Sequence, residues 1–288
     1  MTGRKVIESF QDYLNSPAIN ASQIKPAVES PRHWAVQAPR ADKEAFKIGS
    51  AIHCLVLEGE EKFNELYPVF VKPLPDKTMA AKENKEAYAR FQMQNVGKTI
   101  ITNDDLELVM RVEQSVKAKP QVLAMLEGQD QEFSIYWDEE LYDSSAESPE
   151  TAMLKIPCKA RIDHFHDNKH ILVDLKTARS ASPDDFIRDF LNFGYHIQLA
   201  HYRKALASIG HENVGISIIV LEKEPPYDVV VYSVDEPLME AGDFERNRGV
   251  FNILKAQKAL ASNEWVPGVD AKEGYLNLTM PAWYKVRI

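Results

Sequence analysis

The sequence predicts an α/β domain in which a mixed β-sheet carries helices on both sides. Two short apolar, β-prone runs, 160–165 and 171–175, flank a polar turn at 166–169, which is the pattern of a β-hairpin. Residues 195–209 lie between Gly194 and Gly210, as expected for a separate helix. No internal repeat or low-complexity linker divides the 288 residues. We therefore expect one domain over 1–288, with 1–47 as a helical extension packed on its core.

The composition is that of a soluble globular protein, with 44% hydrophobic and 27% charged residues. No apolar run approaches the roughly 20 residues that cross a bilayer, and the N-terminus lacks the hydrophobic segment of a signal peptide. Cys54 and Cys158 match no C-x-x-C pattern, which argues against a disulfide framework or a thiolate zinc site. The expected location is therefore the reducing cytoplasm, without membrane contact.

The net charge of −9 argues at face value against nucleic-acid binding. That argument is weak for a site built on metal ions, because bound cations reverse the sign of a local acidic cluster. Charge alone does not decide the function.

In the first half of the chain the pattern is mainly helical. Residues 48–58 are apolar on nearly every side and stop at Gly59, which predicts a buried helix containing His53. Asn103, Asp104 and Asp105 form a start signal before an amphipathic helix at 106–117. Further helices are predicted at 22–26, 32–36, 79–95 and 120–126, with a loop at 72–76.

The second half alternates strands and helices. Residues 132–137 alternate as a strand does, and 143–149 are polar and predict a hairpin loop. Ser182 and Pro183 are a helix start signal. Strands are predicted at 216–221 and 228–234, and a long helix at 237–261. A tail containing Trp265, Trp283 and Tyr284 is expected to pack on the body.

The predicted hairpin carries two carboxylates and a lysine. Strand side chains alternate, so Asp174 and Lys176 project on one face while Leu175 points into the core. Asp163 on the neighbouring strand can face Asp174. Charges beside apolar strands are costly unless something pairs with them, and a divalent cation would do so.

Such a group suits metal-assisted phosphodiester hydrolysis. Oxygen ligands hold Mg²⁺, which lowers the pKa of a bound water, and a lysine stabilises charge on the phosphate. Taken alone, however, D-x-K is a weak motif, and its alternative is a plain exposed strand edge.

Three further features have both a functional and a structural interpretation. Gln198 and Tyr202 share one helix face by their i, i+4 spacing, either as site residues or as part of an amphipathic helix with a buried tyrosine. His53 is either a ligand or a core histidine. Glu132, at a strand start, is either part of the site or an edge charge.

In this order the motifs resemble a known family. Gly49-x-x-x-His53, Asp163, Asp174-Leu175-Lys176 and Gln198-x-x-x-Tyr202 resemble the RecB-like branch of the PD-(D/E)XK nucleases, most closely the RecE (exonuclease VIII) catalytic domain. The likeness runs over residues 17–284. One departure is Ile162, where relatives often have proline or glycine before the first aspartate.

The resemblance implies a Mg²⁺-dependent exonuclease, with Mn²⁺ as a substitute, that degrades one strand of linear double-stranded DNA from its 5′ end. It implies 3′ tails for recombination by strand annealing, a RecT-type annealing partner and a homotetrameric ring. It also implies residue roles: metal ligands His53, Asp163, Asp174 and the Leu175 carbonyl, catalytic Lys176, Gln198 and Tyr202 facing DNA, and Glu132 touching metal or pairing with a base.

The alternatives are a structure-specific endonuclease on the same fold and a catalytically inactive DNA-binding module. A small-molecule hydrolase is disfavoured because no nucleophile elbow is present. The Gly97-Lys98-Thr99 stretch lacks the earlier glycine of a phosphate loop, and two cysteines cannot hold an iron–sulfur cluster. We interpret His164, His166 and His170 as surface or DNA-contacting residues rather than as a zinc site.

Overall fold

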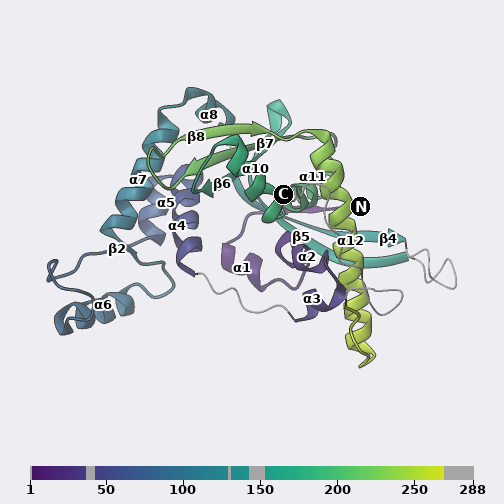
Figure 1. Cartoon of the computed structure of the whole chain (residues 1–288), viewed down its shortest axis with the longest axis horizontal. Coiled ribbons are helices and arrows are strands. Elements are labelled where there is room, and N and C mark those ends of the chain that lie inside the picture. Colours follow the sequence, from purple (N-terminus) through teal and green to yellow (C-terminus); the bar gives the residue numbers. More distant parts are fainter. Residues whose placement is uncertain (1, 37–42, 129–130, 143–152, 269–288) are drawn as a thin grey trace, which may run out of the picture.

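A six-stranded mixed sheet forms the centre of the protein (Figure 1). The computed structural model describes residues 2–36, 43–128, 131–142 and 153–268. The strand order is β1-β4-β5-β6-β7-β8, and within this sheet only β6 and β7 run parallel. The strands are β1 Arg4–Val6, β4 Gln131–Tyr142, β5 Met153–His166, β6 Ile171–Ala178, β7 Gly215–Glu222 and β8 Val229–Ser233, and a separate parallel pair consists of β2 Val69–Phe70 and β3 Ile101–Thr102.

Helices cover both faces of the sheet, which confirms the predicted fold class. One apolar core joins the sheet to α2 (Ala21–Ala27), α10 (Pro183–Asn192), α11 (Tyr195–Ser208) and α12 (Glu236–Ala261). The second core lies on the other face, under α4 (Lys43–His53), the π-helix η1 (Cys54–Glu58), α5 (Glu60–Leu66), α7 (Asn103–Lys117) and α8 (Pro120–Met125). The remaining helices are α1 (Phe10–Asn15), α3 (Pro31–Ala35), α6 (Lys82–Gln94) and the 3₁₀ turn η2 (Asp167–Lys169).

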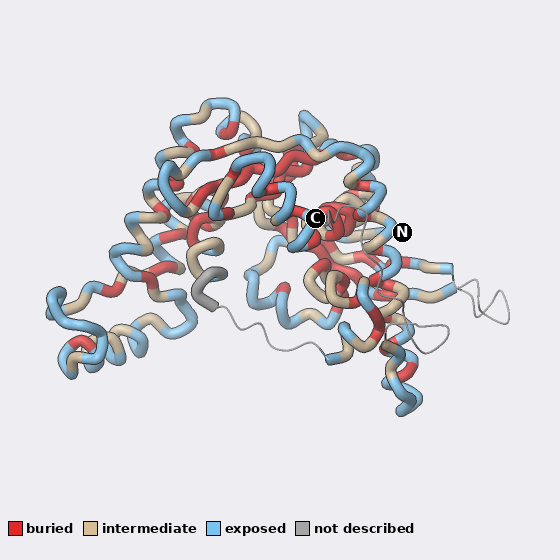
Figure 2. Tube along the Cα trace, in the orientation of Figure 1, coloured by how far each residue is buried: buried red, intermediate tan, exposed pale blue. Residues whose placement is uncertain are grey.

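The central strands are apolar because both of their faces are covered. Leu172 and Ile218 pack into the first core, whereas Leu175 and Ile219 pack into the second, as the alternation of strand side chains requires. The buried tube segments in Figure 2 gather along these strands and α11. A parallel pair needs a crossover, and α10 and α11 connect β6 to β7. This crossover places α11 against the strands that carry the predicted site residues.

Most predicted elements are present, and two strands are longer than predicted. Helices α6, α7 and α8 match the predictions at 79–95, 106–117 and 120–126, and α7 begins with a capping box between Thr102 and Asp105. Strand β4 continues to Tyr142 and β5 begins at Met153, well beyond the predicted 132–137 and 160–165. The predicted loop at 143–149 lies outside the described residues.

The N-terminal segment contributes more than the predicted helices. The pieces predicted at 22–26 and 32–36 are α2 and α3. In addition, β1 pairs with β4 as an edge strand, with Lys5 opposite Ile135. Three residues are too few to give an alternating pattern, so the sequence did not reveal this strand.

The tail is described only as far as residue 268. Trp265 is exposed, and the Arg32 guanidinium lies 4.3 Å from the centre of its ring. Arg32 also donates two hydrogen bonds to the Val266 carbonyl, which ties the end of the described chain to α3. Trp283 and Tyr284 lie outside the described residues. Within the described ranges, every helix is too short or too polar to span a bilayer.

Candidate metal centre

His53 lies at the end of α4, where the helix changes to a π-helix. The predicted continuous helix at 48–58 is therefore two segments, α4 and η1, that meet at His53 and end at Gly59. π-Turns inside helices are frequent at functional sites. A Cβ at Gly49 would lie only 3.3 Å from the Thr177 hydroxyl oxygen, so glycine allows α4 to lie close against β6. This close approach brings His53 to the strands of the predicted hairpin.

Asp163 interrupts the ladder between β5 and β6. The backbone pairing runs from His166 opposite Ile171 to His164 opposite Val173. Beyond it, the Leu175 N–H donates a hydrogen bond of 2.8 Å to Asp163 Oδ2. The partner of the Leu175 N–H is thus a side-chain carboxylate, and Asp163 is held at the point where the two strands part. His53 Nδ1 lies 3.8 Å from the same oxygen.

Glu132 completes a group of three possible ligands. One ligand atom each from His53, Glu132 and Asp163 lies within 4.8 Å of the other two. The Arg161 Nε donates a hydrogen bond of 2.7 Å to Glu132. Both interpretations of Glu132, contact with a metal and pairing with a basic residue, are therefore compatible with its position. Glu132 has a φ of 49°, which is uncommon for a residue with a side chain and costs on the order of 1–3 kcal/mol.

Asp174 is completely buried beside the group and forms an ion pair with Lys176. Apart from this ion pair, its carboxylate oxygens have no hydrogen-bond partner among the described residues. The structure therefore brings Asp174 next to Asp163 but turns its carboxylate to the lysine, and Glu132 takes the third place in the ligand group. The Leu175 carbonyl accepts a hydrogen bond of 3.4 Å from Lys176 Nζ and so faces the same site.

Burial sets the charge states of the site. It raises the pKa of Asp163 and Asp174, and it raises the pKa of Glu132 to about 7, with a further contribution from the Asp163 charge. Burial and the Lys176 charge lower the pKa of His53 to about 4, so its imidazole is neutral near pH 7. Although burial disfavours the Lys176 ammonium, Asp174 and Asp163 hold its pKa above the ordinary value.

These donors fit a divalent cation. Carboxylate oxygens and a neutral imidazole nitrogen converge within one group, and the carboxylates lack enough positive charge nearby to hold them all ionised. A cation there would lower the cost of ionising them. Oxygen-rich ligands suit Mg²⁺ or Mn²⁺ rather than a soft thiophilic metal.

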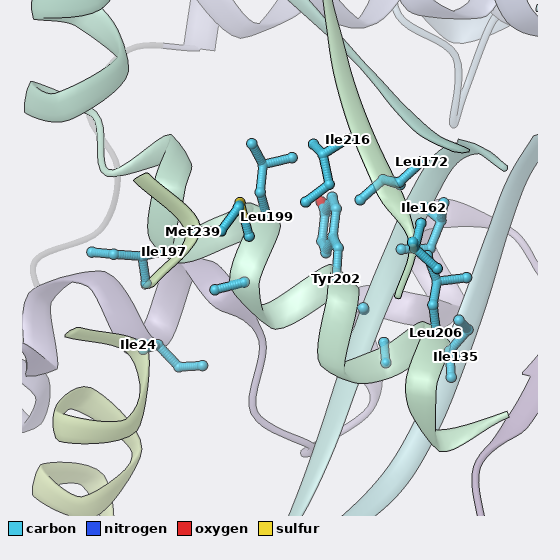
Figure 3. Packing of buried hydrophobic residues seen from close by; sticks show 14 of the residues in the cluster. Ile24, Ile135, Ile162, Leu172, Ile197, Leu199, Tyr202, Leu206, Ile216 and Met239 are labelled. Carbon is cyan, nitrogen blue, oxygen red and sulfur yellow. The ribbon is translucent and has the colours of Figure 1, made fainter. Parts of the chain in front are cut away.

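Gln198 and Tyr202 lie on one face of α11, as their spacing predicted. The Gln198 side-chain amide donates a hydrogen bond of 2.6 Å to the Tyr202 hydroxyl. The Tyr202 ring lies in the first apolar core among Leu199 and Ile216 (Figure 3). Burial, together with the charges of Asp163 and Asp174, raises the pKa of Tyr202, so its hydroxyl keeps its proton. The tyrosine is therefore a core residue whose hydroxyl lies close enough to the acidic site for the carboxylate charges to affect its pKa.

Two residues at the site were missed by the sequence reasoning. Arg161 stands two positions before Asp163 on the same strand face, and this alternation is a signal that could have found it. Tyr195 begins α11, and Lys176 Nζ lies 4.9 Å from its ring centre. Only the tertiary fold shows that contact, because 18 residues of crossover separate the two.

Comparison with known proteins identifies the family. Residues 20–264 match the family DUF3799, described as a PDDEXK-like domain of unknown function. The chain belongs to this family. The PD-(D/E)XK resemblance is thus confirmed, whereas the match does not single out the RecE branch. No match is found among the curated proteins.

One solved structure shares the fold of this DUF3799 chain. A candidate exonuclease from Eubacterium rectale is 14% identical with a TM-score of 0.59, over 96% of this chain and 96% of that chain. A phage-related exonuclease from Haemophilus somnus 129PT is 11% identical over 88% of this chain and 99% of its own, with a TM-score of 0.35 that is too low to carry an argument. The likeness to the Eubacterium rectale protein supports the α/β fold.

The prediction for the histidines of the hairpin is wrong in part. His164 is completely buried and His166 nearly so, whereas both were interpreted as surface or DNA-contacting residues. The reason is that side chains alternate along a strand. His164 follows Asp163 and so points to the opposite face of β5, which the second core covers. His170 Nε2 lies 2.6 Å from the Glu212 carbonyl oxygen, at hydrogen-bond distance.

A pocket of about 380 Å³ between β2 and α6 contains none of the predicted site residues.

Proposed function

We propose that this protein is a divalent-metal-dependent nuclease that hydrolyses phosphodiester bonds in DNA. The observation that carries the proposal is the group of buried Asp174 with half-buried Asp163 and Lys176, beside His53 and Glu132. Several carboxylates with little access to solvent beside one lysine are costly to fold, and a bound cation and phosphate would offset that cost. The PD-(D/E)XK-like family supports this reaction class.

Each residue has a defined part in the proposal. His53, Glu132 and Asp163 would hold the cation, and we propose that Asp174 and the Leu175 carbonyl would join them. The cation, when bound, polarises the phosphate and lowers the pKa of a water molecule. Lys176 leaves Asp174 for the phosphate and stabilises charge there. Gln198 and Tyr202 line the DNA-facing side of the site. The Tyr202 hydroxyl accepts a hydrogen bond from Gln198 and can donate its own proton in a hydrogen bond to the substrate.

The finer proposal follows the resemblance of the motifs. We propose Mg²⁺, replaceable by Mn²⁺, and degradation of one strand of linear duplex DNA from the 5′ end. The resulting 3′ tails would pass to a single-strand annealing protein of the RecT type in the cytoplasm, and the chain would act as a homotetrameric ring. The Eubacterium rectale protein is described as an exonuclease. This description supports our proposal that the chain degrades DNA from its ends rather than by internal cutting.

Digestion of end-labelled DNA tests the proposal. Linear duplexes labelled at the 5′ or the 3′ end are incubated with Mg²⁺ or EDTA, beside a closed circle. We expect loss of the 5′ label first, in Mg²⁺ alone, and intact circles. Cut circles would favour the structure-specific endonuclease. No cleavage by folded protein would favour the inactive DNA-binding module.

Two substitutions test the site within the same assay. Asp174→Ala and Lys176→Ala should each lower cleavage at least a thousandfold while the protein stays folded, because both act on charge at the reacting phosphate. Lys155→Ala is the matched control, since Lys155 pairs with Glu140 on the exposed part of the sheet. Near-normal cleavage by either site variant would disprove the assignment.

A further inference from the structure

Glu132 needs support from outside its own strand. Its φ of 49° is one that a residue with a side chain keeps only where the surroundings hold it. The positions on either side of Glu132 pair with those on either side of Asp163, so the two carboxylates stand opposite each other on β4 and β5. Like charges in opposite positions of a sheet repel. The ligand group therefore depends on whatever keeps Glu132 in this place.

Arg161 supplies that support. Its Nε donates a hydrogen bond of 2.7 Å to Glu132 Oε2, and its side chain is only 13% exposed. Its Nη1 donates a second hydrogen bond of 3.1 Å to the main-chain carbonyl of Glu8. The guanidinium is planar and its N–H groups have fixed directions, so it holds two acceptors in one arrangement. Arg161 thus bridges a proposed metal ligand and the N-terminal part of the chain.

Glu8 belongs to a segment that is bound along β4. We call residues 4–16, which contain β1 and α1, the N-terminal strap. Strand β1 pairs with β4, with Val6 opposite Ser134. After β1, Glu8 Oε1 accepts a hydrogen bond of 2.7 Å from the Tyr136 hydroxyl. The strap therefore follows the end of β4 that carries Glu132.

Lys159 anchors the far end of the strap. It is 2% exposed, and its Nζ donates hydrogen bonds to the carbonyls of Tyr13 at 2.5 Å and Ser16 at 2.7 Å. Carbonyls at the end of a helix such as α1 lack partners within the helix, so an ammonium there satisfies them. Lys159, Arg161 and Asp163 are alternate residues of β5. The strand thus holds the strap with two side chains and carries a proposed metal ligand directly after them.

A contact with DNA phosphate is the other use of an arginine at this place. Two of the nitrogen atoms of Arg161 are, however, already directed at acceptors of the protein itself. A positive charge beside a metal site also opposes binding of the cation. Arg161 therefore favours metal binding only through the arrangement that it gives to Glu132.

We propose that Arg161 is a positioning residue that ties Glu132 to the N-terminal strap and so sets how tightly the site holds its divalent cation. Glu132 stays in the ligand group because Arg161 joins it to the Glu8 carbonyl, and Lys159 and Tyr136 keep the strap in place. The affinity for the cation then depends on a segment that contains none of the proposed ligands. This proposal rests on the metal site of the proposed nuclease and adds how that site is held together.

Mn²⁺ binding in the absence of DNA tests the proposal. The metal-free full chain is titrated with Mn²⁺, and electron paramagnetic resonance measures the free ion. The pH is kept well above the raised pKa of Glu132, so that this carboxylate is ionised throughout. Arg161→Met should bind Mn²⁺ at least tenfold more weakly than the parent, as expected when a residue that orients a ligand is lost. Loss of charge alone predicts tighter binding, and tighter binding or a smaller loss would overturn the proposal.

Arg161→Lys separates the bridge from the charge. It keeps the positive charge but not the planar fork, and it should still bind Mn²⁺ at least threefold more weakly than the parent. Recovery to within threefold would show that charge is sufficient and would overturn the bridge.

Tyr136→Phe tests the strap. It removes a hydrogen bond to Glu8 at a position roughly 13 Å along β4 from Glu132. We expect at least threefold weaker Mn²⁺ binding, because Glu8 and the Arg161 bridge lose an anchor. A smaller effect would overturn the role of the strap.

Two matched controls come from the same strands. Lys155 of β5 pairs with Glu140 of β4 at 2.7 Å, which is the same kind of cross-strand ion pair at an exposed position. Tyr142 is exposed at the end of β4. Lys155→Met and Tyr142→Phe should each keep the Mn²⁺ affinity within twofold of the parent. Melting temperatures in EDTA establish that every variant is folded.

Hydrogen exchange of the metal-free protein gives a measurement that needs no cation. We expect faster backbone exchange in peptides covering residues 4–16 and 131–134 in Arg161→Met than in Lys155→Met, because the bridge between them is lost. Unchanged exchange in both peptides would overturn the proposal even if Mn²⁺ bound more weakly, since Arg161 would then hold neither segment.

The outcomes separate this proposal from the nuclease function. If Arg161→Met loses Mn²⁺ affinity and exchange protection but the parent cuts no DNA, the positioning role stands and the enzyme proposal fails. If the parent cuts DNA in Mg²⁺ while Arg161→Met binds Mn²⁺ like the parent and only its DNA affinity falls, the nuclease stands. Arg161 would then be a substrate contact, and the positioning role would fail.

Discussion

Adjacent glutamates on β4 show how strongly position decides the role of a charge. Glu139 is buried and forms an ion pair with Arg246 of α12, and His201 Nδ1 lies 3.3 Å from Arg246 Nε. His201 Nε2 in turn contacts the Lys159 carbonyl at 3.0 Å. Glu140 points to solvent and pairs with Lys155. The first pair joins β4 to α12 and, through His201, to α11 and β5 inside the protein, whereas the second lies on its surface.

Glu139→Ala and Glu140→Ala should therefore differ in stability. Removing Glu139 leaves the Arg246 charge buried without its partner, and we expect a loss of about 3–5 kcal/mol in the free energy of unfolding. Removing Glu140 breaks an exposed pair and should cost less than about 1 kcal/mol. Urea denaturation of both variants measures the difference, and equal losses would contradict the buried network.

The site glutamate should make the metal-free protein less stable as pH rises. The pKa of Glu132 is raised to about 7 from an ordinary 4.5, so the folded state holds a proton that the unfolded state releases. The contribution of Glu132 to folding stability is then greatest below about pH 4.5 and is lost as pH rises through about 7. Glu132→Gln removes this decline, so its stability advantage should grow between pH 4.5 and 7 by on the order of 1–3 kcal/mol.

Melting temperatures in EDTA at several pH values measure this growth. Glu140→Gln is the control, because the pKa of that exposed group is lowered by Lys155 and its effect on stability has the opposite sign. A difference between Glu132→Gln and the parent protein that stays constant over this pH range would refute the assignment.

At the scale of elements, two glycines determine how α12 packs. A Cβ at Gly242 would lie 2.4 Å from the His196 carbonyl oxygen of α11, and one at Gly249 would lie 2.9 Å from the Ile24 carbonyl oxygen of α2. Such distances are below any real Cβ contact, so α12 approaches both helices only because these positions lack side chains. The position of α11 matters beyond packing, because this helix carries Gln198 and Tyr202.

Gly242→Ala should separate α12 from α11. We expect a loss of about 2–4 kcal/mol in unfolding free energy, because backbone on the facing helix has to move. Arg248→Ala, at an exposed position of the same helix, is the control and should change stability by less than about 0.5 kcal/mol. Chemical denaturation measures both. An unchanged Gly242→Ala stability would show that the two helices have room to part.

At the scale of the whole molecule, metal binding should stabilise the fold. A ligand that binds only the folded state adds about 2.7 kcal/mol at a hundred times its Kd. We therefore expect Mg²⁺ or Mn²⁺ to raise the melting temperature relative to EDTA. Asp163→Ala should abolish this rise, because it removes a member of the ligand group. A rise of equal size in the variant would place the metal elsewhere.

The sequence by itself determined the local part of the site. The period of two on short strands placed Asp174 and Lys176 on one face, and the period of 3.6 placed Gln198 and Tyr202 on one face of α11. Start and stop residues gave most helices within a few positions, as at Gly194 and Gly59. These features depend on neighbours in the chain, and neighbours are what a sequence pattern contains.

Only the tertiary structure decided which charges meet. Glu139 and Arg246 are 107 residues apart, and Arg161 of β5 contacts Glu132 of the neighbouring strand β4. It also turned Asp174 toward Lys176 and buried His164, which the sequence pattern had placed at the surface. Contacts of this kind arise from the register of strands and the packing of helices. Those are set by the total burial of apolar surface, a property that no local stretch of residues carries.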